Sequence, residues 1–228
     1  MRVYISYPPL KGKGKPMLSQ NRQFQWFNEE SHIFPVILGY AATLLKNEGH
    51  EVIWGDSGLD NKGWLAFTKE LIDLQPDVVV FESKTPVIRQ HWKIIKKIKA
   101  YLPLIKVVLL GDHVTWRPEE SFQNCPVDFI VEGGNYDFGL LSILNLLTNK
   151  KNFYGNFYLK RDNSVKFIRG NQLINSDLEN LPFIDRKLTK SEYYGEKWRK
   201  KEKFYYLMAG RDCHWGKCTF CAWTSLFK

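Results

Sequence analysis

Residues 77–81 read Asp-Val-Val-Val-Phe, and residues 105–110 read Ile-Lys-Val-Val-Leu-Leu. Both are nearly continuous apolar runs, which are typical of strands buried on both faces of a parallel sheet. Between them, residues 85–102 repeat apolar side chains at helical spacing and predict a helix that connects the two strands. Thr85 and Pro86 are placed to begin this helix as N-cap and first-turn proline.

The same alternation continues on both sides of this unit. Further strands are predicted at residues 2–6, 51–54 and 128–131. Further helices are predicted from Pro35 to a C-terminal cap at Gly49, over residues 62–74 and over residues 137–147. Five strands separated by helices indicate a parallel sheet with right-handed crossovers. We therefore expect residues 1–150 to form an α/β domain with a Rossmann-like (flavodoxin-like) sheet of five parallel strands.

The pattern changes after residue 150. Residues 156–160 and 165–169 flank Asp162-Asn163-Ser164, whose turn chemistry predicts a β-hairpin. A polar connector follows over residues 171–203, and residues 204–209 (FYYLMA) predict one more strand. We expect three units, namely a domain over 1–150, a hairpin with a basic linker over 151–203, and a C-terminal unit over 204–228.

The composition excludes two classes of protein. Of the 228 residues, 44% are hydrophobic and 25% are charged, which is the balance of a globular rather than a disordered chain. No apolar run approaches the roughly 18 residues that a membrane span requires. The N-terminus has no signal-peptide pattern, so we expect a cytoplasmic protein without a membrane partner.

The net charge of +9 is unevenly spread, and residues 186–203 alone supply +5 of it, from eight basic and three acidic residues. Tyr193, Tyr194 and Trp198 are interleaved with the cations of this basic linker. Such a stretch is either a solvated connector or a surface for a nucleic-acid backbone, and both interpretations stay open.

Three of the four cysteines lie within nine residues, directly after the predicted strand at 204–209; they are Cys213, Cys218 and Cys221. Three thiolates can hold three corners of a cubane iron–sulfur cluster and leave the fourth iron open. A zinc site that adds His214 is the alternative, although adjacent side chains rarely converge on one ion. A disulfide with a spare thiol fits a reducing compartment poorly. Cys125 stands alone and is interpreted as a small buried hydrophobe.

The cysteine loop resembles the cluster loop of the radical S-adenosylmethionine (SAM) enzymes. The chain before it resembles the cobalamin-binding domain that precedes the barrel in one branch of that superfamily. The matching motifs, in chain order, are Tyr7-Pro8-Pro9, Gly49-His50-Glu51-Val52, Pro76-Asp77-Val78-Val79, Gly111-Asp112-His113, Pro118-Glu119-Glu120, Val127-Asp128-Phe129-Ile130-Val131 and Leu181-Pro182-Phe183.

This chain departs from the family pattern at three points. Its cysteines are separated by four and then two residues, where three and then two is common. It lacks the Asp-x-His-x-x-Gly signature that supplies an axial histidine to cobalt in other cobalamin proteins. Gly133-Gly134, preceded by Glu132, stands where Gly-Glu is frequent.

The resemblance implies that Cys213, Cys218 and Cys221 ligate a [4Fe-4S] cluster and that SAM chelates the open iron. Phe220 matches the family aromatic residue that packs near the SAM adenine. One electron from the cluster would cleave SAM reductively, for a methyl transfer or a radical rearrangement of a small-molecule substrate. An electron donor is therefore an implied partner, and no catalytic residue is identified.

Ligands of an open parallel sheet bind beyond the carboxyl ends of its strands. The residues that we expect there, as contacts of a cobalamin cofactor, are Tyr7, Pro8, Ser83, Gly111, His113, Thr115, Glu132, Gly133 and Gly134. Because the Asp-x-His-x-x-Gly signature is absent, we expect cobalamin to bind without a histidine on cobalt.

A (β/α)₈ barrel takes roughly 200 residues or more, and residues 204–228 would supply only its first strand and cluster loop. We therefore expect a truncated product, a fragment or half of a split enzyme that needs a separate chain for the rest of the barrel. Two other functions stay open: a non-catalytic cobalamin-binding module, and an RNA-modifying radical SAM protein that uses the basic linker.

Overall fold

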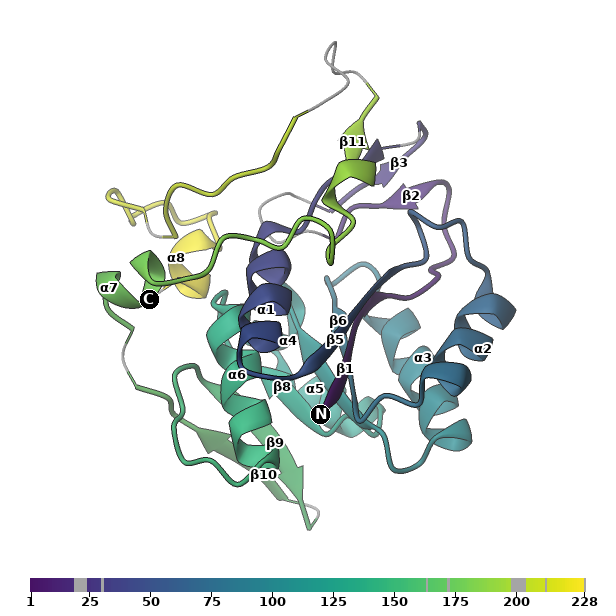
Figure 1. The fold of residues 1–228 in the computed structure, drawn as a ribbon, viewed down its shortest axis with the longest axis horizontal. Helices are drawn as coiled ribbons and strands as arrows, with labels where there is room; N and C mark the ends of the chain where they lie inside the picture. The colour runs from purple at the N-terminus through teal and green to yellow at the C-terminus, as the bar shows by residue number, and fades with distance from the viewer. Residues whose placement is uncertain are drawn as a thin grey trace.

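The computed structural model describes residues 1–18, 24–29, 31–162, 164–171, 173–197, 204–211 and 213–227. Five parallel strands form the centre of its main sheet (Figure 1): β1 (Arg2–Tyr7), β5 (Glu51–Asp56), β6 (Val78–Glu82), β7 (Lys106–Leu110) and β8 (Phe129–Val131). Their spatial order is β5-β1-β6-β7-β8, the flavodoxin-like arrangement in which the second strand lies outside the first. The predicted fold class is confirmed.

The predicted hairpin also forms, and it extends the same sheet. Strand β9 (Phe157–Arg161) pairs antiparallel with β8, and β10 (Ser164–Ile168) pairs with β9. Asp162 adopts a left-handed φ of 51° in the turn, while Asn163 lies outside the described residues. The main sheet therefore continues past residue 150, where the sequence placed the end of the first unit.

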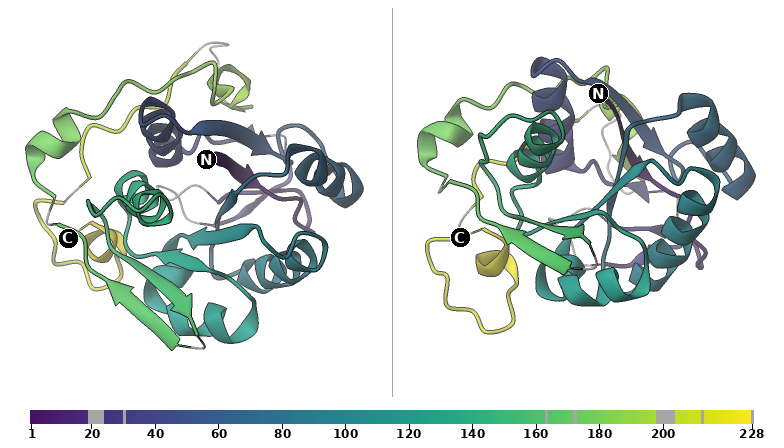
Figure 2. Two further views of the ribbon diagram at one scale, coloured as in Figure 1. Left: turned by 60° about the horizontal axis from the view of Figure 1, so that its bottom comes forward. Right: turned by 90° about the horizontal axis from the view of Figure 1, so that it is seen from below.

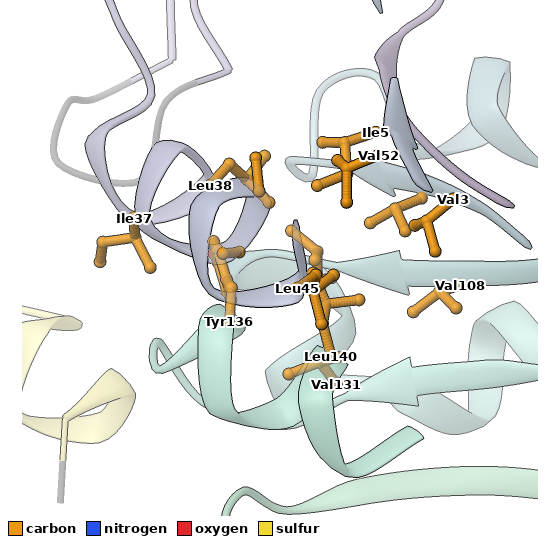
Figure 3. Close-up of a cluster of buried hydrophobic side chains, with 14 of the residues drawn as sticks. Val3, Ile5, Ile37, Leu38, Leu45, Val52, Val108, Val131, Tyr136 and Leu140 are labelled. Carbon is orange, nitrogen blue, oxygen red and sulfur yellow. The ribbon is translucent and has the colours of Figure 1, made fainter. Parts of the chain in front are cut away.

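Helices cover both faces of the sheet (Figure 2). Helices α1 (Val36–Asn47) and α6 (Tyr136–Leu147) pack on one face, where Leu38, Leu45 and Leu140 meet Val3, Val108 and Val131 from the strands (Figure 3). On the other face lie α2 (Trp64–Leu74), α3 (Ile88–Tyr101), α4 (Asp112–Trp116) and α5 (Pro118–Asn124), with Phe67, Ile95 and Phe122 among the side chains that fill it.

The sequence predicts the C-terminal end of α1 correctly, but it does not predict the start of α3 correctly. Helix α1 ends at Asn47, and Gly49 terminates it with a φ of 86°, as predicted. The amides of His50 and Gly49 donate to the carbonyls of Leu45 and Lys46. Helix α3, in contrast, begins at Ile88 and not at Thr85. The Thr85 hydroxyl lies 3.2 Å from Nδ1 of His113 instead of capping the helix.

The linker folds back onto the domain. Trp54 Nε1 donates to the Tyr194 hydroxyl at 3.0 Å, and that hydroxyl donates to Asp56 Oδ2 at 3.0 Å. Tyr194 is buried. The nucleic-acid interpretation needs it exposed among the cations of the linker, and the structure does not place it there. The elements of the linker are short: α7 (Asn175–Glu179), a 3₁₀ turn (Ser191–Tyr193) and β11 (Gly195–Glu196). Three short strands lie between β1 and α1: β2 (Lys15–Pro16), β3 (Trp26–Phe27) and β4 (Ser31–His32), and β11 pairs with β4.

Two cations of the basic linker are also engaged. The Arg186 guanidinium lies over the rings of Phe34 and Tyr205, and Lys190 pairs with Asp60 at 3.3 Å. Residues 198–203, which hold much of the remaining charge, lie outside the described residues.

The strand predicted at residues 204–209 is wrong. The described residues 204–211 run without strand pairing, and Tyr205 and Leu207 are 65% and 77% exposed. An apolar run forms a strand only where a neighbouring strand completes its hydrogen bonds, and the described residues place none beside it. After the cysteine loop comes one short helix, α8 (Trp223–Leu226), drawn in yellow in Figure 1. Among the described residues, no helix is both long and apolar enough to cross a membrane.

Candidate functional site

The candidate site lies at the carboxyl edge of the parallel strands. Strands β1 and β6 are neighbours, and the connections that leave them run to opposite faces of the sheet, which makes this position the topological switch point. Here the Tyr7 hydroxyl donates a hydrogen bond to the Glu82 carboxylate. Burial, reinforced by the Glu82 charge, holds the pKa of Tyr7 well above its usual value, so the phenol stays a donor.

Tyr136, the first residue of α6, adds an unusual group to this edge. Its side chain extends toward α1 (Figure 3) and is 1% exposed, and its hydroxyl has no hydrogen-bond partner among the described residues. Burial raises the pKa of Tyr136 well above its usual value, and the charges of Glu82 and Asp112 raise it further. The hydroxyl therefore stays protonated, as a donor for which the described residues supply no acceptor.

Asp112, the first residue of α4, shows the complementary feature. Its Oδ2 accepts from Lys84 Nζ at 3.0 Å, whereas its Oδ1 is buried and lacks a partner within the described part of the chain. Buried polar atoms are nearly always hydrogen-bonded. A donor and an acceptor that are left open at one edge, among the described residues, are therefore suited to a bound polar ligand.

Two glycine turns frame this edge and are held together by Thr115. Its hydroxyl donates to the Gly111 carbonyl at 2.9 Å and accepts from the Gly133 amide at 3.2 Å. Gly111 has a φ of 119°, and a Cβ there would lie 2.1 Å from the Ser83 carbonyl oxygen. Only glycine fits that turn. The structure thus brings together three of the residues expected at the site.

Ser83 and His113 face protein groups. The Ser83 hydroxyl lies 2.9 Å from Nδ1 of His91, in the interior. His113 is 8% exposed, with Nδ1 3.2 Å from Thr85 Oγ1 and Nε2 3.3 Å from a Glu120 carboxylate oxygen. Burial lowers the pKa of His113 despite the Glu120 charge, so the neutral ring is favoured.

Four of the expected contacts line a cavity of about 650 Å³. Its lining includes Thr115, Glu132, Gly133 and Gly134, together with Ser225 and Leu226 from the C-terminal segment. Asn156 Nδ2 donates to Glu132 at 2.9 Å, which turns that carboxylate toward β9. Tyr7 and Pro8 line a separate cavity of about 510 Å³ near the ends of β1 and β5.

The cysteine loop lies at the surface. Cys213 is exposed, Cys218 and Cys221 are half-buried, and all three thiols are free. Within the described ranges, no three histidine, cysteine or acidic side chains come together in a way that could hold a metal ion. Phe220 is 90% exposed. Cys125, by contrast, is buried, and burial raises the pKa of its thiol to about 12.

Sequence reasoning missed the side chains of Glu82, Asp112 and Tyr136 as site residues. Glu82 had a usable signal, since a charged residue that ends a buried apolar strand points to the ligand edge of the sheet. No sequence signal could have shown that the Tyr136 hydroxyl finds no partner among the described residues, because this depends on what surrounds the hydroxyl in three dimensions.

A comparison with known families gives one match, and it lies over this region. Residues 30–137 match the B12 binding domain family. The match spans Glu82, Asp112, the two glycine turns and Tyr136, and it ends one residue after Tyr136. A comparison with curated protein sequences found no match.

Solved structures show the same B12-binding fold. The cobalamin-dependent SAM radical enzyme OxsB, with aqua-cobalamin and SAM bound, superposes with a TM-score of 0.70 at 16% identity, over 96% of this chain. The radical SAM methyltransferase TsrM from Kitasatospora setae, with cobalamin and a [4Fe-4S] cluster bound, superposes with a TM-score of 0.54 at 16% identity, over 76% of this chain. The present chain spans 28% of OxsB and 29% of TsrM.

Proposed function

We propose that this chain binds a corrinoid at the carboxyl edge of its sheet, as the N-terminal part of a cobalamin-dependent radical SAM enzyme. The observation that carries the proposal is the coincidence of two findings. The B12-binding match covers the edge where Tyr136 and Asp112 present a buried donor and a buried acceptor, neither of which has a partner among the residues that the structure describes.

The chemistry of these two atoms fits a corrinoid. The macrocycle carries peripheral amides, each of which offers an N–H donor and a carbonyl acceptor. The Tyr136 hydroxyl would donate to an amide carbonyl, and Asp112 Oδ1 would accept from an amide N–H. The glycine turns at Gly111 and Gly133 let the backbone come close to a flat ring system. When bound, the corrinoid would supply cobalt-centred methyl transfer or radical chemistry.

The residues below this edge would hold it in shape. The bond from Tyr7 to Glu82 ties β1 to β6, and Thr115 ties the β7 turn to the β8 turn. His113 would remain a structural residue, since Thr85 and Glu120 flank its two nitrogens. Cobalamin would then bind with its own base displaced and with no histidine in its place.

The cluster belongs to the same proposal. Cys213, Cys218 and Cys221 would ligate a [4Fe-4S] cluster, SAM would bind the open iron, and Phe220 would lie near the adenine. Three free thiols within one short surface loop are a suitable donor set, which cluster assembly would draw together. An electron donor and a small-molecule substrate would complete the proposed enzyme, in the cytoplasm.

A cobalamin-binding module without cluster chemistry is the second candidate. It is favoured by the thiols, which are not gathered in the described part of the structure. RNA binding through the basic linker has no comparable support, because Tyr194, Arg186 and Lys190 are engaged within the domain.

Anaerobic reconstitution followed by iron, sulfide and cobalt analysis tests the proposal. We expect one corrinoid and one cubane cluster per chain. Replacement of Cys213, Cys218 or Cys221 by Ala should remove most of the iron and leave the cobalt, while Cys125→Ala, the matched control, should change neither. Cobalt without cysteine-dependent iron would support the binding module. The absence of bound cobalt would contradict both candidates.

A further inference from the structure

Two residues before the first cluster cysteine, Arg211 forms a buried ion pair with the B12-binding fold. Its Nη2 lies 2.6 Å from Asp137 Oδ2 and its Nη1 lies 2.9 Å from Asp137 Oδ1. The same Nη1 donates to Asn135 Oδ1 at 3.1 Å. The two paired side chains are 7% and 0% exposed. This is the two-pronged geometry that arginine makes with a carboxylate and that lysine cannot make.

The cysteine loop is fixed on its other side as well. The Gly134 amide donates to the Leu226 carbonyl at 2.6 Å, and the side chains of Leu226 and Phe227 are buried in the core beside α1 and α6. Residues 213–221, with all three clustered thiols, are therefore held between two anchors. Both anchors lie on residues 133–137, where the turn from β8 to α6 runs into the first two residues of that helix.

The same short segment also carries Gly133 and Tyr136, so it serves both the corrinoid edge and the cysteine loop. On one side it would meet the corrinoid, and on the other it holds the chain that bears the cluster ligands. A bidentate pair that is removed from water resists rearrangement, because opening it leaves a charge unpaired in the interior. Its burial also sets it apart from exposed arginines such as Arg161, whose side chain is 73% exposed.

We propose that Arg211 is a positioning residue, which fixes the cysteine loop to the turn from β8 to α6. The ion pair sets the place of the loop relative to the corrinoid edge, and it orders that edge at the same time. The ion pair in this structure carries the first statement, that Arg211 fixes the cysteine loop. The second statement, that the pair thereby sets the distance between cluster and corrinoid, rests on the proposed function.

Hydrogen–deuterium exchange of the cofactor-free, 228-residue chain tests the first statement. In Arg211→Gln we expect protection at Gly134 and over residues 222–227 to fall on the order of 100-fold, as loss of a buried pair implies. Arg211→Lys should lose nearly as much, because it keeps the charge but lacks the fork. Arg161→Gln, the matched control, should match the parent chain. Unchanged protection in Arg211→Gln would overturn the proposal.

Arg211→Gln leaves Asp137 buried and uncompensated, so the variant could unfold as a whole. The double variant Arg211→Gln with Asp137→Asn removes both charges and separates the two effects. We expect it to regain the parent's protection in β6 and β7 while the loop anchors stay unprotected. Recovery of protection at residues 222–227 in the double variant would contradict the positioning role.

Electron paramagnetic resonance of the chain loaded with cob(II)alamin and the reduced cluster tests the second statement. The two spins interact by a dipolar coupling that falls with the cube of their distance. In the parent chain and in Arg161→Gln, the cluster should shorten the relaxation time of the cobalt spin. With both cofactors present in full amount, Arg211→Gln should largely lose this effect. Identical relaxation in all three proteins would refute the second statement without touching corrinoid or cluster binding.

Discussion

Replacing Tyr136 by Phe should make the cofactor-free protein more stable and its corrinoid binding weaker. The Tyr136 ring is 1% exposed, and its hydroxyl has no partner in the described part of the structure. A polar group buried without a hydrogen bond costs about 1–3 kcal/mol. Removing the oxygen while keeping the ring leaves the packing against α1 intact, so about 1 kcal/mol of stability should be gained.

The same change has the opposite effect on the bound state. If the hydroxyl donates to a corrinoid amide, its loss removes one hydrogen bond with a net value of about 1 kcal/mol. Corrinoid affinity should therefore fall roughly five- to tenfold. The two signs together distinguish a ligand-directed hydroxyl from an ordinary core tyrosine.

Urea unfolding of the cofactor-free chain and equilibrium titration with cobalamin measure the two effects. Tyr7→Phe is the matched control, because its hydroxyl already has a partner in Glu82. That variant should lose stability, since it leaves a buried carboxylate with one bond fewer. If Tyr136→Phe destabilised the chain and left the affinity unchanged, the assignment of this hydroxyl to a ligand would be refuted.

Three further predictions concern the frame of the site. Burial lowers the pKa of His91 from 6.5 to about 4, so the unfolded chain binds a proton at a higher pH than the folded chain does. The free energy of unfolding should therefore fall as the pH drops from 6.5 to 4, by at most about 3 kcal/mol. Urea unfolding across this range should show a shallower decline in His91→Gln, and an equal decline would exclude His91 as the cause. Gly111→Ala should lower the free energy of unfolding by about 3 kcal/mol in the same assay, because of the positive φ of Gly111 and the close Ser83 carbonyl. Gly63→Ala, at a position with open space, should cost little, and equal effects of the two variants would contradict the steric account. Tyr194→Phe should cost about 1–2 kcal/mol through its lost bonds to Asp56 and Trp54, whereas the 65% exposed Tyr193 should tolerate the same change; a silent Tyr194→Phe would show that the linker does not support the domain.

Local sequence pattern predicted most of the sheet, because strands buried on both faces must be continuously apolar. Residues 77–81 and 105–110 carry that pattern, and their strands form within one residue of the expected positions. Gly49 was predicted as a cap because a left-handed φ at a helix end favours glycine, and the structure has that conformation.

Long-range contacts were beyond such patterns. Residues 204–209 have the composition of a strand, but strand formation depends on a neighbour that composition does not reveal. Tyr194 lies among charged residues in the sequence, yet it is buried in the structure. Its hydroxyl is hydrogen-bonded to Trp54 and Asp56, both far from it along the chain. The pairing of Arg211 with Asp137 is of the same kind.

The candidate site was predictable in place and less so in detail. The rule that ligands lie at the carboxyl ends of parallel strands correctly brought Gly111, Thr115 and Gly133 to one edge. It could not tell that the Ser83 hydroxyl faces His91, nor that the Tyr136 hydroxyl finds no partner in the described part of the chain. Those properties depend on side-chain direction, which a strand end alone does not specify.

Anaerobic titration of the 228-residue chain with cob(II)alamin, followed by electron paramagnetic resonance, tests the central claim most directly. Binding at the proposed edge should give a saturable signal without nitrogen splitting from an axial base, and His113→Ala should give the same signal. No saturable binding, or a nitrogen-split signal that disappears in His113→Ala, would contradict the account.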